Sequence, residues 1–88
     1  MKVGFRQSFL KDLEGVDDKR LRKRVKAAIE EVEKAESLQQ INGLKKLKGG
    51  ENFYRLRIGD FRVGIALEGD RIILVRLTNR KDIYRHFP

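Results

Sequence analysis

The 88-residue chain has no cysteine, no tryptophan and a single histidine, His86. Without cysteine it can form no disulfide framework, no thiolate metal site and no Cys–His catalytic pair. Its acidic residues are scattered, so the sequence offers no cluster suited to two Mg²⁺ ions. Lys48-Gly49-Gly50 is not a Walker loop, because the required spacing and the following Ser or Thr are missing. We therefore expect a protein that uses no metal and no other cofactor.

Long apolar segments are missing as well. Met1 is followed by Lys2 and mixed polar sequence, with no stretch that resembles a signal peptide or a membrane span. Together with the lack of cysteine, this predicts a cytoplasmic protein without a membrane partner. The length predicts one domain over residues 1–88, with room for a modest hydrophobic core.

Positive charge is present in excess. Lys and Arg number 21 against 13 Asp and Glu, which gives a formal net charge of +8. Residues 1–38 hold ten bases and eight acids, whereas residues 39–88 hold eleven bases and five acids. A small domain this basic points first to nucleic acid, and second to an anionic protein or a membrane surface. Most of the excess lies in the second half of the chain.

The segment Asn52–Leu67, NFYRLRIGDFRVGIAL, predicts a β-hairpin that turns at Gly59-Asp60. This turn would set three cross-strand pairs: Ile58 with Phe61, Arg57 with Arg62, and Arg55 with Gly64. Side chains alternate along a strand, so one face of the hairpin would be apolar. Its members would be Tyr54, Leu56, Ile58, Phe61, Val63, Ile65 and Leu67.

The other face of this hairpin would carry Arg55, Arg57 and Arg62. Like charges directly opposite each other destabilise an antiparallel pair, so stability alone does not explain Arg57 facing Arg62. An anion bound on this face would explain it. The alternative is a solvated face on which the arginines pair with nearby acids, namely Glu51, Asp60 or Asp82.

The whole pattern predicts an α+β domain in the order β-α-α-β-β-β, with a mainly antiparallel sheet. The expected elements are an edge strand at Lys2–Phe5, a helix at Arg6–Glu14, a long helix capped by Asp17 or Asp18 that runs to Ser37 or Leu38, a connection at Gln39–Glu51, strands near 53–58, 61–67 and 71–77, and a short tail at Asn79–Phe87. Both helices should pack on one sheet face and leave the arginine face free. The sequence leaves open which face Ile73, Val75 and Leu77 join.

The long helix carries its bases early and its acids late, which opposes the helix dipole. One interpretation is a solvated charged face with compensating i,i+4 pairs such as Lys26–Glu30. The other is a basic ridge that binds a phosphate backbone.

Arginine, lysine and tyrosine suit the metal-free cleavage of RNA. The 2′-OH is an internal nucleophile, so a protein needs only to align it, move protons and stabilise charge on the phosphorane. The planar fork of arginine binds phosphate oxygens and stays charged. Tyrosine can stack on an unpaired base.

Three segments carry a family resemblance: SFLKDL, LKKLKGGENFYRLRIGDFRVGI and NRKDIY. With them the chain resembles the RelE/ParE superfamily of bacterial type II toxin–antitoxin toxins over nearly its whole length. The resemblance implies a RelE-like fold and a cognate antitoxin that wraps the toxin in a hetero-oligomer. In the RelE branch it also implies entry into the ribosomal A site and cleavage of mRNA. Two alternatives stay open: a ParE-like inhibitor of DNA gyrase, and an inactive homologue that binds antitoxin or RNA.

The resemblance also implies roles for single residues. Arg62 would stabilise the transition state, Arg55 and Arg57 would hold phosphates, and Arg80 and Tyr84 would contact the scissile phosphate and a neighbouring base. The remaining RNA-binding candidates are Lys45, Lys46, Lys48 and Arg85. Tyr84 has an alternative role, as an aromatic that pins the tail to the sheet.

The proton acceptor is the open question. RelE-like nucleases often carry a lysine where this chain has Arg55, and arginine is effectively never deprotonated. The base would then be Lys46, Lys48, Tyr84 or His86. Histidine is suited to proton transfer near neutral pH, which makes His86 a catalytic candidate.

Overall fold

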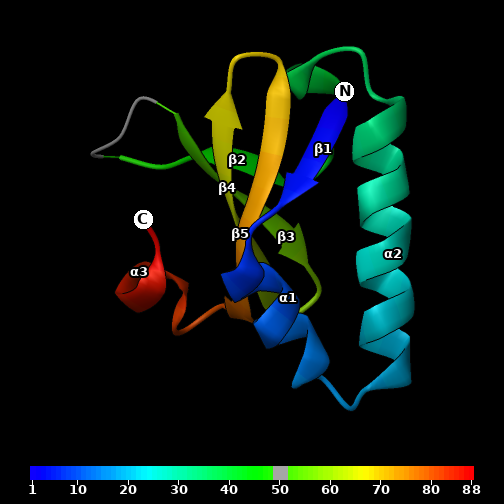
Figure 1. The fold of residues 1–88 in the computed structure, drawn as a ribbon, viewed down its shortest axis with the longest axis vertical. Coiled ribbons are helices and arrows are strands. Elements are labelled where there is room, and N and C mark those ends of the chain that lie inside the picture. Colours follow the sequence, from blue (N-terminus) through cyan, green and yellow to red (C-terminus); the bar gives the residue numbers. More distant parts are fainter. Residues whose placement is uncertain (49–51) are drawn as a thin grey trace.

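The computed structural model describes residues 1–48 and 52–88 (Figure 1). The elements are β1 (Lys2–Phe5), α1 (Gln7–Glu14), α2 (Lys19–Lys34), a 3₁₀ turn at Leu38–Gln40, β2 (Leu44–Lys46), β3 (Phe53–Ile58), β4 (Phe61–Glu68), β5 (Arg71–Asn79) and α3 (Ile83–His86). They form a sheet in the order β1-β5-β4-β3-β2, in which only the β1–β5 pair is parallel. The predicted α+β class with a mainly antiparallel sheet is confirmed.

The predicted register of the central hairpin is confirmed in full. Strands β3 and β4 pair Ile58 with Phe61, Arg57 with Arg62, and Arg55 with Gly64. The turn places Gly59 at φ 58°, a backbone conformation that a residue with a Cβ rarely adopts. A second Gly-Asp turn, with Gly69 at φ 61°, joins β4 to β5 in the same way.

The main hydrophobic core lies between the sheet and the two N-terminal helices. Helix α1 contributes the fully buried Phe9, and α2 contributes mainly Leu21, Val25 and Val32. The sheet contributes Leu56, Ile58, Val63, Ile65, Ile72, Leu74 and Leu77. The predicted apolar face of the hairpin therefore packs against the helices, as expected.

Helix α2 begins where predicted but ends earlier. The Asp18 carboxylate accepts hydrogen bonds from the backbone N–H groups of Arg20 at 2.9 Å and Leu21 at 3.3 Å, so Asp18 is the N-cap. The predicted end at Ser37 or Leu38 is wrong, because Ala35 already leaves the helical conformation with ψ 140°. This exit lets the chain turn so that Leu38 packs against the core.

Part of the predicted connection Gln39–Glu51 is a strand. Residues Leu44–Lys46 pair antiparallel with β3, so that Lys45 lies opposite Arg55. The apolar signal of this strand is short, since Leu44 is its single apolar residue. The pairing therefore depends on the long-range contact with β3.

A β-bulge determines which side chains of β5 face the main core. Ile65 pairs with Leu74 and Gly64 pairs with Arg76, so Val75 has no partner on β4. The extra residue resets the alternation, and Leu74 and Leu77 both reach the main core. Val75 packs on the opposite face of the sheet. The three residues left open by the sequence thus do not share one face.

Helix α1 runs along the edge of β5 beyond the end of β1. The Asp12 carboxylate there accepts hydrogen bonds from Arg76 Nε at 2.7 Å, Arg76 Nη2 at 3.2 Å and the Leu77 N–H at 2.9 Å. This ion pair raises the pKa of Arg76 above its usual value, mainly through the side-chain hydrogen bond. Asp12 thus satisfies a backbone donor that a neighbouring strand would otherwise pair.

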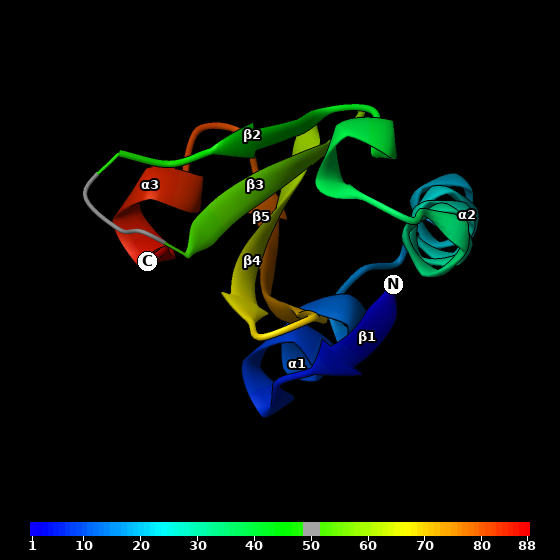
Figure 2. The same cartoon turned by 90° about the horizontal axis from the view of Figure 1, so that it is seen from above.

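The far face of the sheet is only partly free, which corrects the expectation of an open arginine face. Figure 2 shows α3 across the sheet from α2. Ile83 and Phe87 are buried there with Leu47. The rings of Phe53 and Phe87 meet edge to face with centroids 5.4 Å apart. The C-terminal segment therefore covers one end of this face and leaves the end near the β3–β4 turn open.

Candidate functional site

The open part of the far face carries the predicted arginines. Arg57 is exposed and lies opposite the half-buried Arg62 across β3 and β4. Arg55 is half-buried on β3, and its Nη1 donates a hydrogen bond to Gly43 O at 3.1 Å. We call Arg55, Arg57, Arg62 and Arg80 the arginine surface.

Arg62 is held by the backbone of the β3–β4 turn. Its Nη1 donates hydrogen bonds to Gly59 O and Phe61 O, both at 2.9 Å. Burial is the main reason that the pKa of Arg62 lies below its usual value. The positive charges of Arg55, Arg57 and Arg80 lower this pKa further, in that order, whereas Tyr84 acts in the opposite direction. Side chains from two strands and the tail thus share one electrostatic environment.

Backbone contacts bring the tail to this environment. The Arg80 N–H donates a hydrogen bond to Asp60 O at 2.9 Å, which ties the end of β5 to the β3–β4 turn. Asn79 Oδ1 accepts hydrogen bonds from the N–H groups of Lys81 at 2.9 Å and Asp82 at 3.2 Å. This Asx-type turn redirects the chain into α3 and positions Tyr84.

The arginine surface has excess positive charge. In residues 1–48 and 52–88 the salt bridges are Arg6–Glu68 and Arg76–Asp12, so no arginine of the surface is paired with an acid there. The alternative prediction named Asp60, Asp82 and Glu51 as partners; the first two make no such pair, and Glu51 lies outside the described residues. The repulsion that this arrangement leaves is one that a bound anion would relieve.

A groove of about 430 Å³ lies between β2 and the C-terminal segment. Its lining consists of Lys45, Lys46, Leu47, Lys48, Tyr84, Phe87 and Pro88. Tyr84, whose side chain is 66% exposed, thus lines this lysine groove and also influences Arg62. An exposed tyrosine in this position could stack on an unpaired base next to the positive charges of both groups.

Sequence comparison decides the family. A sequence model described as the ParE toxin of the type II toxin–antitoxin system parDE matches residues 3–84. The chain belongs to this toxin family. It is 46% identical to Toxin RelE3 of Methanocaldococcus jannaschii over 89 residues, with all of both chains covered. Because this relative is archaeal, the bacterial origin implied by the resemblance is not supported by it.

Solved toxin structures share the fold. The toxin superposes with a TM-score of 0.80 on a chain of the RelB–RelE antitoxin–toxin complex from Methanococcus jannaschii, at 44% identity, covering 97% of this chain and 99% of the other. An archaeal RelE–RelB complex from Pyrococcus horikoshii matches with a TM-score of 0.72 at 23% identity, covering 90% and 93%. At that identity the second match speaks for the fold alone.

The structure of this toxin separates the predicted site residues into two groups. It brings Arg55, Arg57, Arg62, Arg80 and Tyr84 together, and it gathers Lys45, Lys46 and Lys48 at the adjoining groove. Arg85 and His86 are exposed on α3, and neither lines the groove nor is among the charges that act on Arg62. In the described part of the toxin, no group of three metal-ligating side chains gathers, and no helix is long and apolar enough to span a membrane.

Sequence reasoning missed two residues that shape the arginine surface. Gly43, at φ 81°, accepts hydrogen bonds through its carbonyl from the Arg57 N–H at 3.0 Å and from Arg55 Nη1. Arg24 of α2 fills the space beside Gly59, where the Cβ of any larger residue would lie 2.5 Å from its Nη1. A glycine before a short strand was the available signal for Gly43, whereas nothing local points from Arg24 to the turn.

Proposed function

We propose that this toxin is an endoribonuclease that cuts mRNA on the ribosome, in the cytoplasm, without a metal ion. One observation carries the proposal: the half-buried Arg62 guanidinium shares its environment with three further arginines and a tyrosine, and no carboxylate pairs with them in the described chain. Such an environment favours a group with delocalised negative charge, which describes the phosphorane formed when the 2′-OH attacks the scissile phosphate.

The roles follow from the positions. Arg62 is fixed to the turn by two hydrogen bonds, so it can stabilise the developing charge without reorganising first. Arg55 and Arg57 lie beside it on β3 and would orient phosphates, and Arg80 would bind from the tail. Tyr84 would stack on the base next to the scissile bond.

The proton acceptor is proposed to come from the lysine groove or from Tyr84. Lys46, Lys48 and Tyr84 line one groove beside the arginine surface, so a proton on the 2′-OH of a bound nucleotide would be within their reach. His86 is exposed on α3 and does not line this groove, which makes it the weaker candidate.

An antitoxin partner belongs to the same proposal. The Methanococcus jannaschii relative was solved as a RelB–RelE complex, and its RelE chain is similar to this toxin over nearly its full length. We expect this toxin to bind an antitoxin of its own, encoded by a neighbouring reading frame, in a hetero-oligomer that suppresses its activity.

The test is the expression of the toxin under tight control, followed by mapping of mRNA 5′ ends. Cuts phased with codons on translated messages are expected. Arg62→Ala should lower their frequency about 10²- to 10³-fold, as the loss of one transition-state donor typically does. The exposed Arg71 at the start of β5 provides a control of equal charge, and Arg71→Ala should cut as the wild type does.

The ParE description of the family favours one alternative, inhibition of DNA gyrase without cleavage of RNA. Induction of the DNA-damage response with intact mRNA would replace the nuclease proposal with this one. A protein without effect on growth would instead indicate an inactive homologue.

A further inference from the structure

Three arginines contact the two-residue turn between β3 and β4. The Gly59 carbonyl accepts a hydrogen bond from Arg62 Nη1 at 2.9 Å. The Asp60 carbonyl accepts one from the Arg80 N–H, also at 2.9 Å. The third arginine is Arg24 of α2, whose guanidinium lies against Gly59. Arg62 and Arg80 have roles in the proposed cleavage, whereas Arg24 has none.

The Arg24 guanidinium fills the space that a side chain on Gly59 would occupy. A Cβ at Gly59 would lie 2.5 Å from Arg24 Nη1, 3.2 Å from Cζ and 3.5 Å from Nη2. Gly59 itself has φ 58°, and a glycine backbone moves more freely than that of other residues because it lacks a Cβ. The turn therefore receives from α2 a lateral contact that Gly59 cannot provide for itself.

Charge pairing does not explain the position of Arg24. Asp18 and Asp60 line the same hollow of about 240 Å³ between α2 and the turn, but within residues 1–48 and 52–88 Arg24 forms no salt bridge with either. Ile58 and Phe61 also line this hollow, and they offer apolar surface to the methylene stem of an arginine. The contact of Arg24 with the turn is thus one of packing.

The charge of Arg24 is also not what acts on Arg62. The charges that lower the pKa of the Arg62 guanidinium belong to Arg55, Arg57 and Arg80. Arg24 instead contacts the residue whose carbonyl holds that guanidinium in place. A donor stabilises a transition state best when it needs no reorganisation, so the position of this carbonyl matters for the developing charge.

We propose that Arg24 is a positioning residue for the cleavage of RNA. By covering Gly59 it restrains the turn, and the restrained turn keeps the Arg62 guanidinium in the geometry that stabilises the phosphorane. Arg24 itself touches neither the RNA nor the reacting atoms. The effect on cleavage rests on the proposed function, whereas the effect on the order of the Arg62 side chain does not.

The contact is tested by substitutions on both sides of it. Gly59→Ala places a Cβ in the space of Arg24, at a φ that residues with a Cβ rarely adopt, and should lower the Tm by about 4 °C or more. In an Arg24→Ala background the clash is absent and only the backbone strain remains, so the same substitution should lower the Tm by less. Thermal melts followed by circular dichroism measure both changes. Equal losses in the two backgrounds would show that Arg24 does not hold this position and would overturn the inference.

The role in cleavage is tested with mRNA on ribosomes under single-turnover conditions, which give the maximal rate and the half-saturating toxin concentration separately. Arg24→Ala should lower the maximal rate about tenfold and leave the half-saturating concentration within about twofold of the wild type. Arg24→Lys keeps the charge but lacks the planar group, so its maximal rate should also fall. Lys23→Ala is the matched control and should cleave as the wild type does, because Lys23 is exposed on the same helix, carries the same charge and does not line the hollow.

Two kinetic results would overturn the positioning role. A higher half-saturating concentration at an unchanged maximal rate would mean that Arg24 binds a phosphate of the RNA directly. Full activity of Arg24→Lys would mean that the charge suffices and that the planar contact with Gly59 does not matter.

A second readout does not depend on cleavage. In toxin with isotopically labelled arginine, NMR measures how fast the Nη1 protons of Arg62 exchange with water, and their two hydrogen bonds to the turn slow this exchange. Arg24→Ala should accelerate the exchange about tenfold, and Lys23→Ala should leave it unchanged. Unchanged exchange in Arg24→Ala would overturn the inference even in a toxin that cuts RNA through Arg62. Faster exchange in a toxin that cuts no RNA would instead refute the proposed activity and retain the restraint on Arg62.

Discussion

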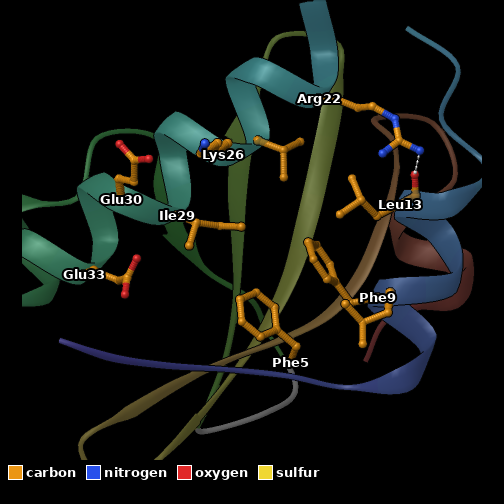
Figure 3. A pocket seen from close by; sticks show the side chains of 10 residues that line it. Phe5, Phe9, Leu13, Arg22, Lys26, Ile29, Glu30 and Glu33 are labelled. Carbon is orange, nitrogen blue, oxygen red and sulfur yellow. Dashed lines mark hydrogen bonds between the residues drawn. The ribbon is translucent and has the colours of Figure 1, made fainter. Parts of the chain in front are cut away.

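The arginine surface lies on one side of the sheet, and an apolar groove lined by Phe5, Leu10 and Ile29 lies on the other, between α2 and the β1–α1 segment (Figure 3). The two differ in almost every physical respect. The first collects charges of one sign around the half-buried Arg62, and the second collects exposed apolar side chains under a rim of mixed charge. A surface of one charge selects for a polyanion, whereas an apolar hollow with both charges selects for a protein chain. The contrast shows that a single sheet of this size can present two faces of opposite physical character.

The largest expected effect comes from removing the side chain that anchors the C-terminal segment to the far face of the sheet. Phe87 is 3% exposed, and a Cβ at Gly64 would lie 2.5 Å from its ring. Phe87→Ala should lower the free energy of unfolding by about 3 kcal/mol and release Tyr84 from the site. Denaturant unfolding and RNA cleavage should both report the loss. Phe87→Leu, which keeps most of the apolar volume, should retain activity; equal cleavage by Phe87→Ala and wild type would contradict this role.

The next variant removes the contact between α1 and β5, on the helix side of the sheet. Asp12→Ala leaves the Leu77 N–H and the Arg76 guanidinium without their shared acceptor and should cost about 2 kcal/mol of stability. Because Asp12 lies on the helix side of the sheet, RNA cleavage by the folded variant should stay near the wild-type value. Asp12→Asn retains an acceptor for the Leu77 N–H, so its stability should lie between those of Asp12→Ala and the wild type. A loss of RNA cleavage greater than the unfolded fraction explains would contradict the independence of the two faces.

The smallest effects test the charges on the two surfaces. Arg22 at the groove donates hydrogen bonds to Val16 O at 2.7 Å and Leu13 O at 3.0 Å, so Arg22→Gln should lower the free energy of unfolding by about 1 kcal/mol.

Arg57 faces Arg62, so Arg57→Gln should raise the free energy of unfolding by about 0.3 kcal/mol at low ionic strength. Thermal melts in low and high salt separate the two, since salt should remove most of the Arg57 effect. A stabilisation by Arg57→Gln that persists in high salt would rule out charge repulsion as its cause.

Local pattern predicted the central hairpin well. Alternation of apolar and arginine residues, together with the Gly59-Asp60 turn, was enough to predict every cross-strand pair from Ile58–Phe61 to Arg55–Gly64. Both helices and the N-cap at Asp17 or Asp18 were predicted for the same reason, because caps and periodicities are properties of short segments. Three features were not predicted: the end of α2 at Ala35, the strand at Leu44–Lys46, and the C-terminal segment that covers part of the far face.

These failures share a cause. A three-residue strand has too little pattern of its own, and it forms because β3 offers it a partner. The bulge at Val75 depends on how β5 follows β4, and the burial of Phe87 depends on space left by Gly64. Each involves residues distant in sequence, so no local signal reports it.

The sequence by itself determined that Arg55, Arg57 and Arg62 share one sheet face, because the side chains of a strand alternate and a two-residue turn sets its register. The family resemblance named Arg80 and Tyr84, but only the tertiary structure shows how the tail reaches the arginines and how β1, α1 and α2 enclose an apolar groove. Those arrangements arise from packing between segments far apart in the chain, where burial of Phe87 and Ile83 directs the tail and the Asp12 carboxylate holds α1 against β5. The residues of both surfaces are visible in the sequence, but their assembly into sites is a property of the folded chain.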